Sequence, residues 1–183
     1  AAARRLAERN RLVDLEQELV AAGHRFASTT ETDVNLHAYE EWGRDCLARF
    51  NGMWAFALWD GRRRELFCAR DRLGVKPFYY TAFLFASEIM ALRAHPLAGR
   101  QPNDRMLMTF LAWGVADHTA ETMYDGIFQL PPAHALVVRE GGAGVPERYW
   151  DFAMNGAVRG ADDDAAARRV RELLTDAVRL RLR

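Results

Sequence analysis

Three charged residues stand together where an apolar segment of the sequence ends: Arg70, Asp71 and Arg72. The segment that ends with the first two of them, residues 65–71, mixes Leu66, Phe67 and Cys68 with charges and predicts a β-strand. Gly74 and Pro77 follow, and both residue types favour a tight turn. Burying charges between apolar segments is costly unless the charges pair or face a functional site. We therefore expect these charges either to pair or to face such a site.

The cysteines and histidines are the other residues whose types suit catalysis or metal binding. A cysteine attacks as its thiolate and needs a proton acceptor beside it. Cys46 falls in a predicted helix and Cys68 in mid-strand, so both are interpreted as small buried hydrophobic residues. His37, on a mostly apolar helix, is expected to be half-buried. No metal site is expected, because metal-ligand spacing is missing among the five histidines, His24, His37, His95, His118 and His134.

The elements that must position these residues centre on residues 50–80. This segment predicts two strands joined by an arginine-rich turn after Gly61, then a third strand from Phe78. Residues 53–60 are apolar on both faces of the first strand. We therefore expect this strand in the interior of a two-sheet sandwich, with Trp54 and Phe56 largely buried.

The rest of the chain alternates predicted helices and short strands. Helices are expected over residues 1–22, 33–42, 44–50, 88–93 and 103–113. Thr32 and Asn103 are the expected N-caps of the second and last of these. The helix over residues 103–113 has an expected apolar face of Met106, Leu107, Phe110 and Leu111. Short strands are expected over residues 24–26, 83–87, 133–139 and 148–151.

Composition indicates one well-packed core and excludes several classes of protein. The chain has 183 residues, of which 50% are hydrophobic and 27% charged. Its formal net charge is zero at pH 7, so neither a nucleic-acid nor a membrane-surface partner is indicated. No apolar run reaches the roughly 18 residues of a membrane span, and no secretory signal is visible. Two cysteines fit a reducing compartment, so a cytoplasmic location is expected.

Several motifs in this order and spacing carry a resemblance to a known family. They are Asn51–Ala57 (NGMWAFA), Ala69–Pro77 (ARDRLGVKP) and Phe85–Ile89 (FASEI), and the sequence from Gly23 to Gly52 continues the similarity. Together they resemble the glutaminase half of glutamine-hydrolysing asparagine synthetases. The resemblance implies an α+β fold, an αββα four-layer sandwich of two mainly antiparallel sheets of the Ntn-hydrolase type.

The resemblance also implies a catalytic mechanism whose nucleophile we do not identify in this sequence. In the family, an N-terminal cysteine attacks the glutamine side-chain amide, and its own α-amino group acts as the base. Ala1 occupies the first position and cannot do this. The family's Asn-Gly-Glu oxyanion segment is also not found, and Asn51–Gly52 is interpreted as a turn. The chain as written is therefore expected not to release ammonia from glutamine.

Five residues are expected at or near the glutamine site on the basis of the resemblance. Arg5 matches an arginine that holds the glutamine carboxylate, although an exposed helix arginine is an equal interpretation. Glu31 stands where the family carries an aspartate for the glutamine α-ammonium, and its alternative role is a helix-start acid. Asp71, Arg72 and Lys76 are expected to brace the loop beside the site by ion pairing, without taking part in chemistry.

The chain is expected to contain one domain and the start of another. Residues 1–153 form the expected glutaminase domain, and residues 154–183 a linker and the first helix of an ATP-dependent synthetase domain. This helix has an apolar stripe of Val170, Leu173, Leu174, Ala177 and Val178. We expect it to pack only marginally on the first domain; a membrane-surface helix is the alternative.

The expected function is glutamine hydrolysis that supplies ammonia for the ATP- and Mg²⁺-dependent amidation of aspartate in that second domain, with no cofactor in the first. One alternative is a catalytically inactive domain of another ATP-dependent amide ligase, similar to β-lactam synthetases. Another is a non-catalytic domain that binds a partner synthetase domain. The residue at the processed N-terminus would discriminate among them, and a homodimer stays open.

Finally, two places suggest that segments of the natural chain are missing from the sequence. Thr81–Ala82 would have to join two strands as a two-residue hairpin, for which a β-branched residue is poorly suited. A similar join is expected within Ala1–Arg11.

Overall fold

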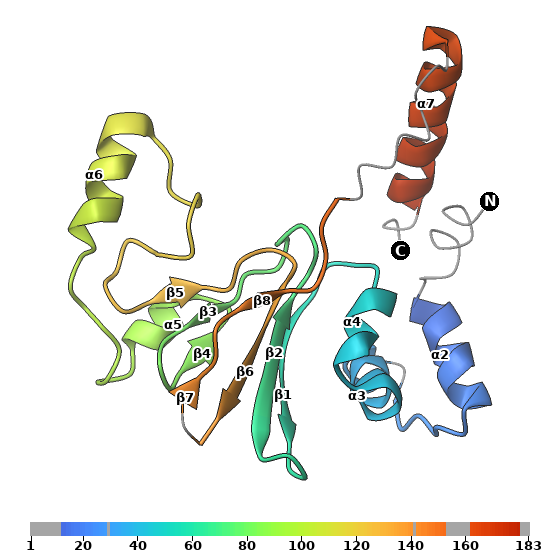
Figure 1. Cartoon of the computed structure of the whole chain (residues 1–183), viewed down its shortest axis with the longest axis horizontal. Helices are drawn as coiled ribbons and strands as arrows, with labels where there is room; N and C mark the ends of the chain where they lie inside the picture. Colours follow the sequence, from blue (N-terminus) through green and yellow to red (C-terminus); the bar gives the residue numbers. More distant parts are fainter. Residues whose placement is uncertain (1–11, 29, 141, 153–161, 180–183) are drawn as a thin grey trace.

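The computed structural model describes residues 12–28, 30–140, 142–152 and 162–179. It is a mixed α+β structure with two antiparallel sheets (Figure 1). The α-helices are α2 (Leu12–Ala21), α3 (Glu31–Trp42), α4 (Cys46–Arg49), α5 (Ile89–Arg93), α6 (Asp104–Trp113) and α7 (Asp163–Arg179), with a 3-10 turn η1 (Gly43–Asp45) between α3 and α4.

The larger sheet has five strands and is built around β2. Its order is β1-β2-β6-β7, and β8 also pairs with β6. These strands are β1 (Ala55–Asp60), β2 (Glu65–Arg70), β6 (His134–Arg139), β7 (Gly142–Ala143) and β8 (Glu147–Arg148). The smaller sheet has the order β4-β3-β5, formed by β3 (Tyr79–Tyr80), β4 (Phe85–Ala86) and β5 (Phe128–Gln129).

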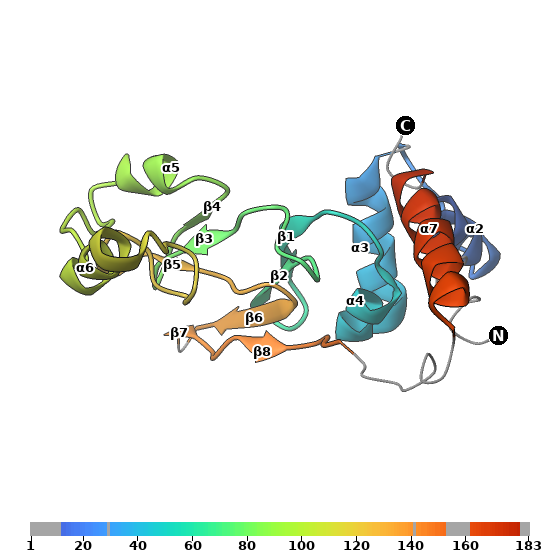
Figure 2. The same ribbon diagram turned by 90° about the horizontal axis from the view of Figure 1, so that it is seen from above.

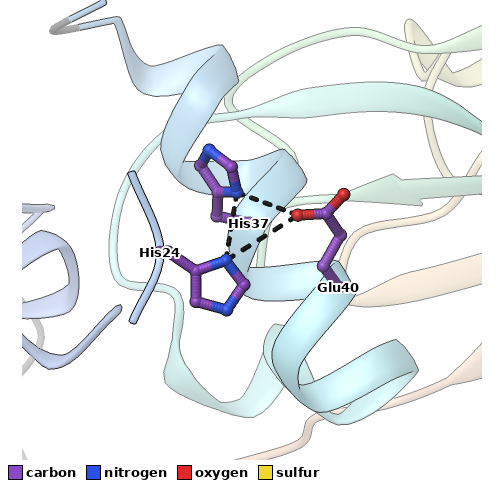
Figure 3. Close-up of side chains that lie close together, drawn as sticks. All are labelled: His24, His37 and Glu40. Atoms are coloured by element: carbon purple, nitrogen blue, oxygen red, sulfur yellow. Dashed lines mark hydrogen bonds and ion pairs between the residues drawn. The ribbon is translucent and has the colours of Figure 1, made fainter. Parts of the chain in front are cut away.

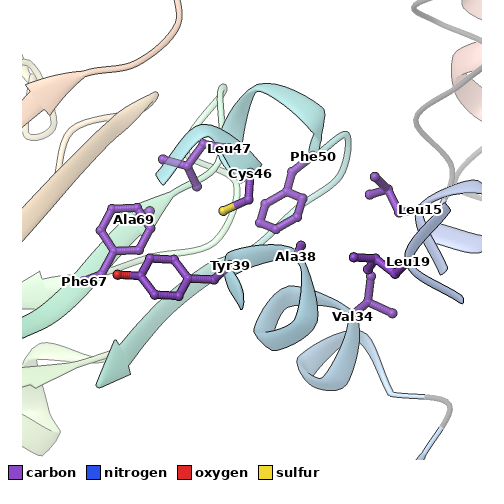
Figure 4. Packing of buried hydrophobic residues seen from close by; sticks show 10 residues of the cluster. All are labelled: Leu15, Leu19, Val34, Ala38, Tyr39, Cys46, Leu47, Phe50, Phe67 and Ala69. Carbon is purple, nitrogen blue, oxygen red and sulfur yellow. The ribbon is translucent and has the colours of Figure 1, made fainter. Parts of the chain in front are cut away.

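Three hydrophobic clusters hold these elements in successive layers (Figure 2). The first joins α2, α3 and α4 to one face of the five-stranded sheet (Figure 4), and Phe67 is fully buried in it. The second lies on the other face of that sheet, where Cys68 and Leu136 meet Phe78 and Leu130. The third joins the smaller sheet to α5 around Leu92. The five-stranded sheet is therefore covered on both faces.

The position expected for residues 53–60 is wrong. Strand β1 lies at the edge of its sheet among the described strands, and β2 occupies the interior. Trp54 and Phe56 are only half-buried, and Trp59 is 60% exposed. An edge strand has a neighbour on one side only, so apolar side chains on both faces do not by themselves place a strand in the centre. Apolar patterning identified two covered faces, but it contains no information about the neighbouring strand.

Two further expectations, the start of α3 and a strand over residues 24–26, are also wrong. Helix α3 begins at Glu31 with Thr30 as N-cap, rather than at Asp33 after Thr32. The carboxylate of Asp33 accepts hydrogen bonds from the backbone N–H (2.8 Å) and hydroxyl (3.1 Å) of Ser28, so the first turn of the helix forms two residues earlier than expected. Residues 24–26 form no strand, because no neighbouring strand lies beside them in the described structure.

Helix α6 has the predicted caps but not the predicted burial. The Asn103 side chain accepts a hydrogen bond from the N–H of Met106 (3.2 Å), and Gly114 ends the helix in the left-handed conformation. Of the expected apolar face, Met106 is buried, whereas Phe110 and Leu111 are exposed. Capping is a local property and was predicted; burial depends on what covers the helix.

The connection between β3 and β4 is not the two-residue hairpin expected from the sequence, so Thr81–Ala82 no longer indicates a missing segment. Tyr80 pairs with Phe85, so the loop has four residues, 81–84, instead of two. The Thr81 hydroxyl accepts hydrogen bonds from the N–H groups of Phe83 (3.3 Å) and Leu84 (3.1 Å). Threonine suits this role, because its hydroxyl can replace a backbone acceptor in a turn. The expectation for Ala1–Arg11 lies outside the described residues.

Helix α7 presents an apolar stripe to the surface. Val170, Leu173, Leu174 and Val178 are all exposed, in line with the marginal packing expected from the sequence. The linker expected over residues 154–160 lies outside the described residues. Among the helices described, none combines the length and apolar character needed to cross a membrane.

Candidate functional site

A cavity of about 600 Å³ lies between α3, β1 and the turn that follows β2. Its floor is apolar and comes mainly from Trp54, Phe56 and Leu58. Polar groups reach it from three parts of the chain: α3, the turn after β2 and the end of β4, which provide Glu31, Thr32, Asn35, Lys76 and Ser87. An apolar pocket with a few convergent polar groups is the usual form of a small-molecule site.

Glu31 and Asp33 lie two residues apart at the start of α3, and the structure gives them different roles. Asp33 binds Ser28, and the backbone N–H of that serine is the main reason why the pKa of Asp33 is lowered. Glu31 lines the cavity. Both acids lie in the first turn of the helix, where a negative charge is favourable. Glu31, the acid that the resemblance led us to expect at the site, is thus the one of the two that lines the cavity.

Asp71 organises the turn that carries Lys76 to the cavity. Its carboxylate is almost fully buried and accepts three backbone N–H groups, from Leu73 (3.1 Å), Val75 (3.0 Å) and Lys76 (2.9 Å). The sequence led us to expect ion pairs here. In the described part of the chain no ion pair joins Asp71 to Arg72 or Lys76, because the carboxylate points into the turn, where the amide groups converge.

Arg70, the last residue of β2, holds the same turn through hydrogen bonds to its carbonyl oxygens. Its buried guanidinium donates hydrogen bonds to the carbonyl oxygens of Lys76 (2.8 Å), Gly74 (2.7 Å) and Leu130 (2.7 Å). Burial lowers the pKa of Arg70, and the nearby Asp71 charge opposes that shift. Gly74 has a φ of +67°, and a Cβ there would come within 2.7 Å of Pro132. Only glycine fits this position without strain.

Arg72 lies away from the cavity-facing residues. Its guanidinium donates to the carbonyl oxygen of Ala48 (3.0 Å) and lies 5.4 Å from the ring centre of Trp150. Burial lowers its pKa. Arg72 thus ties the end of β2 to α4 and to the segment after β8. Arg5, the remaining expected substrate contact, lies outside the described residues.

Neither cysteine is placed for nucleophilic chemistry. Cys46 and Cys68 are both buried, free thiols, and burial raises the pKa of each to about 12. A thiol with that pKa is almost entirely protonated at neutral pH and is a poor nucleophile. This agrees with their interpretation as small hydrophobic core residues.

Asn35 and Ser87 were not identified as site residues from the sequence. Asn35 is four residues after Glu31, a spacing that places both on one face of a helix, so the helical repeat could have identified it. Ser87 follows β4 and reaches the cavity through the fold of the smaller sheet. Only the long-range structure reveals that contact.

The comparisons with known proteins extend over most of the chain. The family model described as "Glutamine amidotransferase domain" matches residues 11–150. Asparagine synthetase [glutamine-hydrolyzing] 3 of Bacillus subtilis is 43% identical over 90% of this chain and 27% of its own length. Amidase chry2 of Gibberella zeae is 31% identical over 87% of this chain and 24% of its own.

The similar solved structures include glutamine phosphoribosylpyrophosphate (PRPP) amidotransferase from B. subtilis. It has a TM-score of 0.49 and 21% sequence identity, over 80% of this chain and 28% of that one. The chain spans about a quarter of the length of the two curated relatives. The family match covers most of the described structure, including α3, β1, β2 and the cavity between them. The chain therefore belongs to the glutamine amidotransferase domain family.

Proposed function

We propose that this domain binds glutamine in the cavity beside β1 and serves as the glutaminase half of an asparagine-synthetase-like enzyme. The observation that carries the proposal is that Glu31 and Lys76 both line this one cavity. A carboxylate and an ammonium group suit the α-ammonium and α-carboxylate of an amino acid. The apolar floor, with Trp54 and Phe56, suits the methylene groups of its side chain.

The layers of the structure support the finer fold assignment. Helices α2–α4, the five-stranded sheet, the smaller sheet and α5 follow one another through three apolar clusters. We assign this order to the αββα sandwich of the Ntn hydrolases. In that fold this domain would be separate from the domain that consumes its ammonia. The buried free cysteines are compatible with a cytoplasmic location.

The acceptor of the ammonia is proposed from the relatives. The B. subtilis relative is named a glutamine-hydrolysing asparagine synthetase and is much longer than this chain. On that basis, ATP and Mg²⁺ would act in a further domain, where aspartate is amidated. The Gibberella relative is named an amidase, so a different amide ligase or amidase remains the second candidate.

Glutamine binding tests the cavity directly. Calorimetric titration of L-glutamine should give one site per chain, and Glu31→Gln should weaken binding by about 10- to 100-fold, as expected for loss of a charged hydrogen-bond partner. Glu140→Gln is the matched control, because Glu140 is exposed and pairs with Arg64 (2.6 Å) far from the cavity. Absence of glutamine binding would favour the inactive-ligase or partner-binding alternatives.

Ammonia release separates binding from catalysis. In the proposed mechanism neither Cys46 nor Cys68 is the nucleophile, because both thiols are buried and protonated. The natural protein, with its processed N-terminus identified by mass spectrometry, should begin with cysteine and release ammonia from glutamine. Its Cys46→Ala and Cys68→Ala variants should release ammonia at the parent rate, and loss of that release in either variant would contradict the proposed mechanism.

A further inference from the structure

Two histidines and a glutamate meet beside α3 (Figure 3), and none of the three lines the cavity. His24 comes from the segment after α2, whereas His37 and Glu40 come from α3. The two Nδ1 atoms lie 3.2 Å apart, and the Oε2 atom of Glu40 lies 2.9 Å from Nδ1 of His37 and 3.7 Å from Nδ1 of His24. Three potential ligand atoms thus form a small triangle.

The size of this triangle matches a metal coordination sphere. Zinc binds histidine nitrogen and carboxylate oxygen at about 2.0–2.2 Å, so neighbouring ligands of a tetrahedral ion lie about 3.3 Å apart. The three measured separations, 2.9, 3.2 and 3.7 Å, bracket that value. An ion seated over the triangle would therefore reach all three atoms with small side-chain movements and keep a fourth position for water.

Glu41 orients one of these ligands. Its Oε2 atom lies 3.0 Å from Nε2 of His24, the ring nitrogen opposite the triangle. A carboxylate at this position can accept a hydrogen bond from Nε2–H, and the Nδ1 lone pair of that tautomer is directed at the triangle. Metal-binding histidines are commonly held in this way by a carboxylate. This contact therefore favours the tautomer of His24 that a metal ligand requires.

The surroundings of the cluster are compatible with a stable site. Both histidine side chains are largely buried, with 16% and 18% exposure. The ring of Phe26 packs edge-on against His37 with 4.8 Å between ring centres. The thiols of Cys46 and Cys68, which would compete for a soft cation, are buried in the core and protonated. The cluster is thus the strongest candidate for a transition metal among the described residues.

We propose that His24, His37 and Glu40 bind a divalent transition-metal ion of the zinc type. The ion would fasten the segment after α2 to α3, the helix that also supplies Glu31 and Asn35 to the cavity. Its role is structural: it stabilises the helical layer and takes no part in the chemistry of the cavity. The proposal does not depend on the function proposed above.

Titration of zinc into the chelator-treated protein tests the proposal. We expect one Zn²⁺ per chain and a rise in Tm on binding. Loss of a carboxylate that orients a metal ligand costs about 10- to 100-fold in affinity, so Glu41→Gln should weaken binding by that factor. His24→Gln and His37→Gln each remove a ligand and should weaken binding by more than about 100-fold.

His118→Gln is the matched control, because His118 is exposed and lies outside the cluster. It should leave zinc affinity unchanged, which would exclude adventitious binding to surface histidines. Far-UV circular dichroism of every variant in EDTA should match the parent, so that a folding defect is not mistaken for a lost ligand. Saturation at no defined stoichiometry, or equal affinity in the parent and the His24→Gln variant, would overturn the proposal and leave a hydrogen-bonded histidine pair.

Discussion

Strands β1 and β2 pair along six residues, yet they differ sharply in what surrounds them. The side chains of β2 are buried at five of six positions, whereas every side chain of β1 is half-buried or exposed. Strand β2 has a neighbour on both sides, and β1 forms a wall of the cavity. The comparison teaches that the interior strand supports the structure, while its neighbour leaves space for a ligand.

The two ends of β2 strengthen this contrast, because each holds a buried charge that is fully engaged. Glu65 accepts two hydrogen bonds from Arg44 (2.8 and 2.9 Å) and one from Arg139 (3.0 Å). Arg70 donates to three carbonyl oxygens at the other end. A buried charge is tolerated only when it is paired or hydrogen-bonded in this way. The charges of β2 thus connect the sheet to the helical layer and to the turn at the cavity.

The largest difference between the two strands is expected when one aromatic ring on each strand is removed and the losses of unfolding free energy are compared. Phe67→Ala removes a fully buried ring that stacks on Tyr39 at 5.3 Å and should cost about 4 kcal/mol of unfolding free energy. Phe56→Ala should cost about 2 kcal/mol, because part of its ring already faces the cavity. Urea unfolding measures both, and equal losses would mean that the two strands are equally buried in solution.

Two glycines with the same backbone conformation test the close packing at the end of β2. Gly74 and Gly114 have φ of +67° and +68°, but only Gly74 has an atom, Pro132 Cγ, within reach of an added Cβ. Gly114→Ala should cost about 1 kcal/mol from its conformation alone. Gly74→Ala should cost about 3 kcal/mol, since overpacking adds to that strain. Similar unfolding midpoints for both variants would contradict the close contact.

The contribution of Glu65, on β2, to the free energy of unfolding should depend on pH. The hydrogen bond from Arg44 is the main cause that lowers its pKa below the ordinary 4.5. Its stabilising effect is therefore complete above pH 4.5 and disappears as the pH falls through the lowered value. Glu65→Gln should cost about 2 kcal/mol at pH 7, from the loss of charged hydrogen bonds. Below pH 4.5 the parent and variant should converge in urea unfolding, whereas a constant difference down to pH 2 would argue against a charged Glu65.

The smallest effect is expected at α7. None of its residues is buried, whereas α6 buries Met106, so the amides of α7 should exchange with solvent faster than those of α6. Hydrogen exchange followed by mass spectrometry should show this difference between the two helices, and the amides of β2 should exchange more slowly than those of either helix. Protection of α7 equal to that of α6 would instead show that α7 packs firmly on the rest of the domain.

Much of the local structure could be predicted from the sequence. Asn103 and Gly114 bound α6 as expected, because capping depends on a few neighbouring residues. The hairpin of β1 and β2 followed from apolar strands around a polar turn. Burial of Cys46 and Cys68 followed from their apolar neighbours. The family motifs carried the assignment of the domain, which the family match confirms.

What could not be predicted depends on contacts between distant residues. Neither the edge position of β1 nor the approach of Ser87 to the cavity is encoded in the apolar pattern of one segment. Likewise, His24 and His37 are 13 residues apart and show no familiar ligand spacing. They meet because α2 and α3 share a hydrophobic core, a fact that only the packed structure supplies.

Among the described strands β1 stands at the edge of its sheet, and this position has a consequence for the colloidal behaviour of the domain. In the described part of the chain no strand covers that edge, and residues 54–59 carry no charge before Asp60. Uncovered, uncharged edges recruit strands from other molecules and start aggregation. The arginines at positions 62–64 act as gatekeepers at one end of the strand. A charge introduced at the exposed Trp59 should therefore slow self-association while leaving both clusters on the sheet intact.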